Sequence, residues 1–186
     1  DFVTSHPQHQ GSIAILLTSD GEGPATDGTV KVVETLKKQK VELDYCLIGE
    51  PTSTEHLGDT IKNGRRGSLT GKLIIYGHQG HVAYPQLAEN PIHRGAAAIH
   101  ELAHFTWDQG NNYFPATTWQ ISNIHAGTGA ANVIPGALEL IFNFRYATCS
   151  TLTSLQAQLE SVLQRHQLRY ELTWLGHSKP YLSEAG

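Results

Sequence analysis

Residues Ser68–Tyr76 read SLTGKLIIY, and the alternation of side chains along this stretch is typical of a strand with one solvated face. A helical segment, Pro91–Trp107, follows it in the chain. Two further strands are predicted next, over Thr117–His125 and over Leu138–Tyr146 (LELIFNFRY). The strand at Ser68 therefore opens a β-α-β-β series.

Two more elements complete this series. Leu152–His166 is predicted to be an amphipathic helix, and one of its faces carries Leu152, Leu155, Leu159, Val162 and Leu163. Leu168–Leu175 is predicted to be the last strand. The order β-α-β-β-α-β is that of a ferredoxin-like sandwich, an antiparallel sheet with both helices on one face.

The residues before Gly64 have a different character. Ser12–Thr18 (SIAILLT) and Asp44–Gly49 are short apolar runs, typical of strands buried on both faces. Thr29–Lys40 lies between them and is predicted to be a helix with lysines in its last turn. This β-α-β pattern indicates the edge of a larger, mainly parallel sheet, because two strands cannot form such a sheet alone.

Composition narrows the functional classes. The 186 residues include 13 Lys and Arg against 17 Asp and Glu, so the net charge of −4 offers no basic field to nucleic acid. No stretch approaches the ~20 apolar residues that would span a membrane. The two cysteines are too few for a disulfide scaffold and fit a reducing, cytoplasmic compartment. Cys46 lies in an apolar run and is expected to be a buried thiol.

One short motif suggests a metal site on a helix. The run His100-Glu101-Leu102-Ala103-His104 matches H-E-x-x-H, in which two histidines one turn apart bind zinc and the glutamate acts as general base. No third ligand follows at the spacing of the extended motif, and the helix already has an apolar face beside the histidines. A zincin remains an alternative hypothesis.

Two acidic loops follow the first two predicted strands. Glu22 lies in the loop of residues 18–24 and Glu50 in that of residues 48–52. Carboxylates at neighbouring strand ends can converge on one cation. The alternative is that both are solvated loop acids.

Histidine and arginine provide two further candidate sites. Gly77–Pro85 (GHQGHVAYP) is a predicted turn that holds His81 out of the sheet, although a lone histidine is more often structural. Arg65 and Arg66 follow Gly64, and Arg145 lies on a distant strand. Paired guanidinium groups suit carboxylate ligands, and ordinary surface charge is the alternative.

Long motifs along nearly the whole chain resemble those of the dizinc aminoacylase and carboxypeptidase family of metallopeptidases. They are TSDGEGPATDGT, DYCLIGEPTSTE, KNGRRGSL, GHQGHVAYPQLAENPIH, WDQGN, FPATTWQISNIHAGTGAANVIPG and FNFRY. The resemblance implies an α/β catalytic domain that holds two zinc ions, with cobalt or manganese as possible substitutes, and an inserted ferredoxin-like lid that forms a homodimer.

The resemblance also implies a domain division and an activity. Residues 1–66 would be the end of the first catalytic segment, residues 67–176 the lid, and residues 177–186 the return to the catalytic domain. The expected activity is zinc-dependent hydrolysis of an amide in a small, doubly anionic succinylated substrate. Nucleic acid and membrane are not expected partners.

Individual residues take roles from the same resemblance. Glu22 and Glu50 match the carboxylates that bind one zinc ion each. His81 matches the lid histidine that stabilises the oxyanion in the site of the partner subunit. The positions that hold the carboxylates and amine of the substrate are matched by Arg65, Ser68, Tyr84, Asn132 and Arg145.

Two departures from the family pattern bear on activity. The family has Asp-Glu-Glu where this chain has Asp20-Gly21-Glu22, so the general base, typically worth ~10²–10⁴-fold in rate, is missing. The family's histidine and bridging aspartate ligands also have no counterpart in the sequence. These departures and the absence of methionine predict that the chain is an internal fragment of an enzyme. The fragment itself is expected to be inactive. A non-catalytic dimerisation module is the alternative.

Overall fold

The structure is a computed structural model that describes residues 2–19 and 25–183. The chain divides into two compact units, Asp1–Pro51 and Thr52–Gly186. Across the described ranges, the helices are all too short or too polar to traverse a lipid bilayer.

The first unit contains two helices among its described residues, α1 (Phe2–Ser5) and α2 (Thr29–Lys38). The predicted helix at residues 29–40 is therefore confirmed, with its end two residues earlier. Lys37 and Lys38 lie in its last turn, where their charge favours the carbonyl end of the helix. The chain then leaves helical geometry at Lys40, whose φ is +57°.

The two strands predicted in the first unit are not formed. Residues 12–18 and 44–49 have no partner strand among the described residues, and their apolar side chains are open to solvent. Leu17 is 89% exposed and Leu47 is 93% exposed. A strand requires a neighbouring ladder to satisfy its backbone, which an apolar sequence cannot supply alone. Cys46, expected to be buried, is exposed for the same reason.

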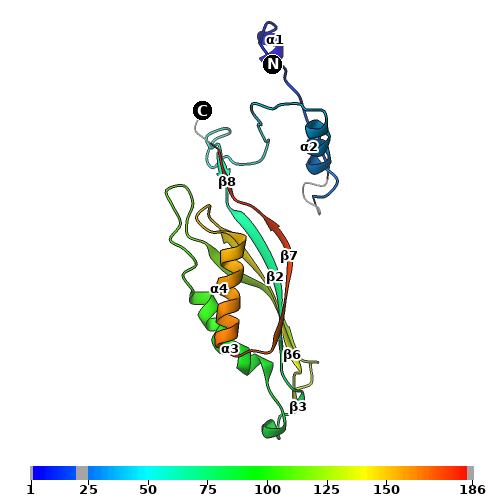
Figure 1. The fold of residues 1–186 in the computed structure, drawn as a ribbon, viewed down its shortest axis with the longest axis vertical. Helices are drawn as coiled ribbons and strands as arrows, with labels where there is room; N and C mark the ends of the chain where they lie inside the picture. Colours follow the sequence, from blue (N-terminus) through cyan, green and yellow to red (C-terminus); the bar gives the residue numbers. More distant parts are fainter. Residues whose placement is uncertain (1, 20–24, 184–186) are drawn as a thin grey trace. The chain divides into compact units, whose positions relative to one another are not determined.

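The second unit is built on a four-stranded antiparallel sheet in the order β4-β6-β2-β7 (Figure 1). Its strands are β2 (Gly67–Tyr76), β4 (Thr118–Ala126), β6 (Ala137–Tyr146) and β7 (Tyr170–Ser178). Helices α3 (Pro91–His104) and α4 (Leu152–Arg165) cover one face. The ferredoxin-like sandwich predicted from the sequence is confirmed.

Short ladders extend both ends of this sheet. At one end β1 (Gly64–Arg65) pairs with β8 (Tyr181–Leu182). At the other end β3 (Gly80–His81) pairs with β5 (Val133–Ile134), and a 3-10 turn, η1 (Pro85–Leu87), follows β3. These ladders hold the segments that carry the predicted site residues.

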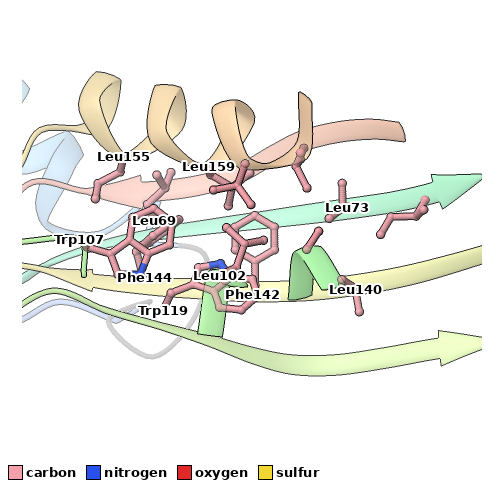
Figure 2. Packing of buried hydrophobic residues seen from close by; sticks show 14 of the residues in the cluster. Leu69, Leu73, Leu102, Trp107, Trp119, Leu140, Phe142, Phe144, Leu155 and Leu159 are labelled. Carbon is pink, nitrogen blue, oxygen red and sulfur yellow. The ribbon is translucent and has the colours of Figure 1, made fainter. Parts of the chain in front are cut away.

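The core lies between the sheet and the two helices (Figure 2). Burial alternates residue by residue along β2 and β6, which places Leu69 and Leu73 beside Phe142 and Phe144 on the inner face. Leu155 and Leu159 of α4 pack onto them. Each of these side chains is 0–1% exposed, and burying one contributes about 1.5–3 kcal/mol.

Helix α3 ends three residues before its predicted end. Phe105 adopts an extended conformation, with φ of −68° and ψ of 132°, and terminates the helix. This turns Trp107 into the core, where its ring packs edge-on against Phe144 with 4.6 Å between ring centroids. Tertiary packing of an aromatic side chain therefore overrides the helical pattern of the sequence.

Asp108 joins the segment after α3 to the segment after β6. Its Oδ1 accepts hydrogen bonds from the backbone N–H groups of Gly110 (2.9 Å) and Thr117 (2.8 Å). Its Oδ2 accepts from the hydroxyl groups of Thr117 and Ser150, both at 2.5 Å. Burial opposes ionisation of Asp108, but the donors from Ser150 and Thr117 outweigh it and lower the pKa to about 2.

We expect Asp108→Asn to lower the free energy of unfolding at pH 7 by about 1–3 kcal/mol, because the amide group cannot accept all four hydrogen bonds. The pKa of Asp108 is depressed in the folded state, so its stabilisation is present above the unfolded pKa of about 4 and is lost as the pH falls towards 2. Urea denaturation at pH 7 and pH 3 measures both effects.

Asp44→Asn is the control for this substitution, because Asp44 is exposed in the other unit. It should leave the unfolding midpoint unchanged. A loss of stability in Asp108→Asn that is equal at both pH values would contradict the role given to the ionised carboxylate.

Candidate functional site

A basic pocket lies where β2 begins. Its volume is about 380 Å³, and it is lined by Lys62, Gly64, Arg65, Arg66, Phe114 and Arg145. Two of the residues predicted to hold substrate carboxylates, Arg65 and Arg145, therefore lie in one pocket although 80 residues separate them in the sequence. Both are exposed.

Strand pairing brings these residues together. The β1–β8 ladder places Arg65 opposite Tyr181. The β2–β6 ladder places Ser68 directly opposite Arg145, so a third predicted residue lies beside the pocket. The Ser68 hydroxyl oxygen accepts a hydrogen bond from the Asn143 side chain at 3.0 Å, which orients it on the sheet.

The electrostatics of the pocket favour an anion. Four of its lining residues are cationic and none is acidic. The ion pairs formed between described residues involve other cations, on Lys31, Lys72, Arg94, Arg165 and His166. Guanidinium groups donate two parallel hydrogen bonds to a carboxylate, so this cluster suits a ligand with carboxylate groups.

A second group of predicted residues gathers around His81. The β3–β5 ladder brings Asn132 to within 3.5 Å of it, measured from Asn132 Nδ2 to His81 Nε2. The ring of Tyr84 lies 5.9 Å from the imidazole, measured between centroids. The backbone N–H of Ala83 donates to His81 Nδ1 at 3.1 Å. Nδ1 is thus engaged by the backbone, and Nε2 is the ring nitrogen that faces Asn132 and is left for a ligand.

The two groups lie at opposite ends of β2 (Figure 1). Arg65 lies two residues before this ten-residue strand and His81 follows it. A strand of that length spans about 30 Å. A small substrate therefore cannot contact the basic pocket and His81 of the same chain at once.

The predicted metal ligands do not form a site in the described residues. Glu50 is exposed and lies outside the helices and strands, whereas Glu22, like Asp20 and Gly21, lies outside the described residues. In ranges 2–19 and 25–183, no three His, Cys, Asp or Glu side chains are grouped so that they could hold a metal ion. A catalytic zinc site needs about three such protein ligands, so the described part of this chain does not fit zinc by itself.

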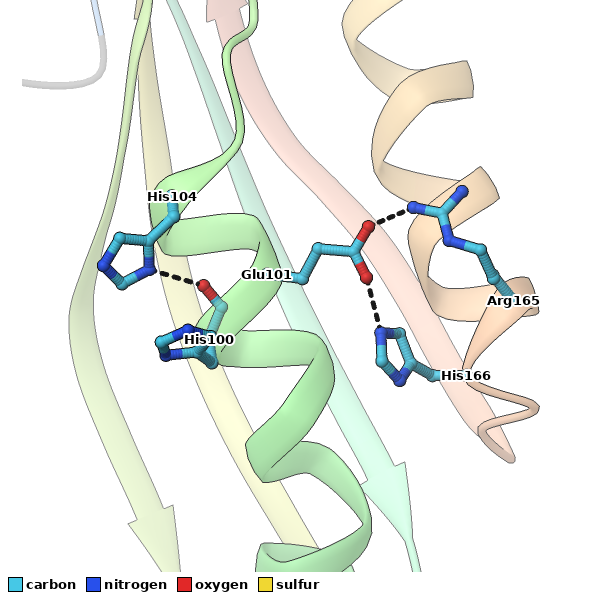
Figure 3. Close-up of polar contacts among 5 residues, drawn as sticks. All are labelled: His100, Glu101, His104, Arg165 and His166. Carbon is cyan, nitrogen blue, oxygen red and sulfur yellow. Dashed lines mark hydrogen bonds and ion pairs between the residues drawn. The ribbon is translucent and has the colours of Figure 1, made fainter.

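The H-E-x-x-H run does not have the geometry of a zincin (Figure 3). Glu101 points away from the two histidines to α4, where its carboxylate pairs with Arg165 and accepts from His166 Nε2 at 2.6 Å. These hydrogen bonds, that from His166 first, lower the pKa of Glu101. His104 Nδ1 donates to the His100 carbonyl oxygen at 2.8 Å, and the two rings lie 4.4 Å apart. Glu101 therefore joins the two helices.

Two lining residues of the basic pocket were not predicted from the sequence. Lys62 stands three residues before Arg65, and its charge within KNGRRG was the available signal. Phe114 opens the FPATTWQ motif, but the sequence did not place it in the pocket, because it lies 50 residues beyond Gly64 in the chain.

Comparison with known proteins gives close sequence relatives. Succinyl-diaminopimelate desuccinylase of Nitrosomonas europaea is 62% identical over 186 residues, and that of Burkholderia cenocepacia is 60% identical over the same length. The chain spans about half the length of these curated relatives, 50% and 49% respectively.

Solved structures resemble the fold at much lower identity. An M20 family metallo-carboxypeptidase from Sulfolobus solfataricus matches 64% of this chain and 45% of its own, with a TM-score of 0.56 at 14% identity. An amidase of the hydantoinase/carbamoylase family from Burkholderia phymatum matches 66% of this chain and 31% of its own, with a TM-score of 0.56 at 20% identity.

A family-level match covers more than half of the chain. The model of the peptidase dimerisation domain of the M20 family matches residues 63–171, which include strands β2, β4 and β6, the start of β7, both covering helices and the basic pocket's Arg65 and Arg145. The chain therefore belongs to the M20 peptidase dimerisation-domain family.

Proposed function

We propose that this chain is part of a metal-dependent amide hydrolase that converts N-succinyl-LL-2,6-diaminopimelate and water to succinate and LL-2,6-diaminopimelate. The reaction would serve lysine and diaminopimelate biosynthesis in the cytoplasm. The observation that carries the proposal is 60–62% identity to desuccinylases along all 186 residues. The four cations of the basic pocket, which form no ion pair with another described residue, support an anionic substrate.

Each group of residues would have its own task. Arg65 and Arg145 would bind substrate carboxylates, with Ser68 beside them. His81 would donate its Nε2 proton to the oxyanion that develops when the amide carbonyl is attacked. Tyr84 and Asn132 lie next to His81 and would hold the substrate at that end.

The distance between these groups supports a homodimer. Since about 30 Å separates the basic pocket from His81 in one chain, both can contact one substrate only if they come from different subunits. The match to a peptidase dimerisation domain agrees with this arrangement. We propose that His81 acts in the site of the partner subunit.

The metal would be zinc, with cobalt or manganese as possible substitutes. This chain would contribute Glu22 and Glu50 as ligands. Gly21 occupies the position of the family's general base and has no group to accept a proton. The 186-residue polypeptide by itself is therefore proposed to be inactive.

A second candidate function is dimerisation without catalysis. The match to a dimerisation domain favours it. In this case the polypeptide would associate through its lid and bind anions but not hydrolyse them.

Substituting the 186 residues into the full-length Nitrosomonas europaea relative separates the two candidates. We expect the chimera with Gly21→Glu to release succinate about 10²–10⁴-fold faster than the chimera with Gly21, because a general base is restored. Succinate release with added zinc is the measurement. The 186-residue chain with Gly21→Glu is the control and should not exceed a metal blank. Turnover by this control would show that the account of its missing ligands is wrong.

Removing either arginine from the basic pocket should weaken substrate recognition. In the Gly21→Glu chimera, we expect Arg65→Ala and Arg145→Ala each to lower kcat/KM by about 10–100-fold, the loss expected for a hydrogen bond to a charged group. Lys37→Ala on α2 is the control, because Lys37 is an exposed cation outside the pocket. Unchanged kcat/KM in both arginine variants would contradict the assignment.

The homodimer is tested on the 186-residue chain. We expect light scattering at high concentration to give the mass of two chains, about twice 20.4 kDa, because the lid surface would pair about a two-fold axis. A strict monomer over the accessible concentration range would count against a site shared between subunits.

A further inference from the structure

The loop between Asp108 and Thr117 brings an aromatic side chain to the basic pocket. Phe114 lies in this loop and lines the pocket together with the cations. A Cβ added at Gly64 would lie 2.9 Å from Phe114 Cζ, so the ring reaches the backbone of β1 next to Arg65. The pocket therefore combines an apolar surface with positive charge.

Hydrogen bonds within the loop fix the position of Phe114. Asn111 Oδ1 accepts from the backbone N–H groups of Tyr113 (3.0 Å) and Phe114 (2.9 Å). The backbone N–H of Asn111 donates to the Phe114 carbonyl oxygen at 2.9 Å. The Asn111 side chain also donates to the Thr148 hydroxyl oxygen at 2.9 Å, which ties the loop to the segment after β6.

The base of the loop is equally constrained. Gly110 has a φ of +70°, and a Cβ there would lie 2.6 Å from the backbone nitrogen of Ala116. Asp108 accepts hydrogen bonds from Gly110 and from Thr117, one at each side of the loop. Phe114 is therefore held in place before any ligand binds, which reduces the entropy lost on binding.

We infer that Phe114 is a specificity-determining residue, which makes the pocket prefer organic dianions with methylene groups over inorganic dianions. The cations attract both kinds of anion, since their attraction depends on charge. Methylene groups placed against an aromatic ring lose contact with water, which favours binding of the organic anion alone. This inference rests on the proposed function, because it concerns the same anion site.

Anion titration of the 186-residue chain tests the inference, with succinate and sulfate as probes at constant ionic strength. The wild-type chain binds succinate more tightly than sulfate. Phe114→Ala weakens succinate binding by about three- to tenfold, because contact with two methylene groups is lost, and changes sulfate binding by less than twofold. Phe114→Leu keeps most of the preference, because an apolar surface remains.

Tyr113→Ala is the matched control. Tyr113 lies next to Phe114 in the same loop, is 66% exposed and does not line the pocket. Tyr113→Ala leaves the binding of both succinate and sulfate unchanged. Thermal unfolding of each variant shows whether the lid stays folded.

The inference would be overturned if the wild-type chain did not bind succinate more tightly than sulfate. It would also be overturned if Phe114→Ala weakened the binding of both anions equally, or weakened neither. If the Gly21→Glu chimera hydrolyses the substrate but Phe114→Ala keeps the preference for succinate, only this inference is rejected. If Phe114→Ala loses the preference for succinate but the chimera does not hydrolyse the substrate, only the proposed reaction is rejected.

Discussion

The ten-residue antiparallel ladder between β2 and β6 is the interaction on which the rest of the second unit depends. It pairs every residue from Gly67, opposite Tyr146, to Tyr76, opposite Ala137. Because side chains alternate between faces, this register places the large apolar residues of both strands under α3 and α4. A slip by one residue would turn them to the outer face and leave the helices without a core.

The same ladder determines the geometry of the candidate site. It sets Ser68 beside Arg145 at one end and directs the chain towards His81 at the other. The sheet is rigid because its inner face is packed, so these two ends cannot approach one another within a chain. The length of the strand therefore supports the proposal of a site shared by two subunits. The loop of Asp108 and Phe114 adds the apolar side of the basic pocket, and its hydrogen bonds connect that pocket to the end of β6.

Sequence reasoning succeeded where local pattern and tertiary structure agree. The alternation at Ser68–Tyr76 and the amphipathic helix after Thr151 predicted their elements, because one face of each is buried. It failed in the first unit, where residues 12–18 have an apolar sequence but no neighbouring strand among the described residues. For the H-E-x-x-H run it disfavoured a zincin, which the geometry bears out, but the spacing of His100 and His104 could not show that Glu101 turns to α4.

By itself the sequence determined the ferredoxin-like order of elements and the family resemblance, from which the proposal that Gly21 stands in place of a general base was drawn. These depend on residue identity and short-range periodicity, which a single chain displays directly. Only the tertiary structure decided that Arg65 and Arg145 line one pocket, that Phe114 joins them and that His81 lies at the far end of the sheet. Such contacts depend on strand register and loop hydrogen bonds between residues far apart in the chain, which local sequence patterns do not encode.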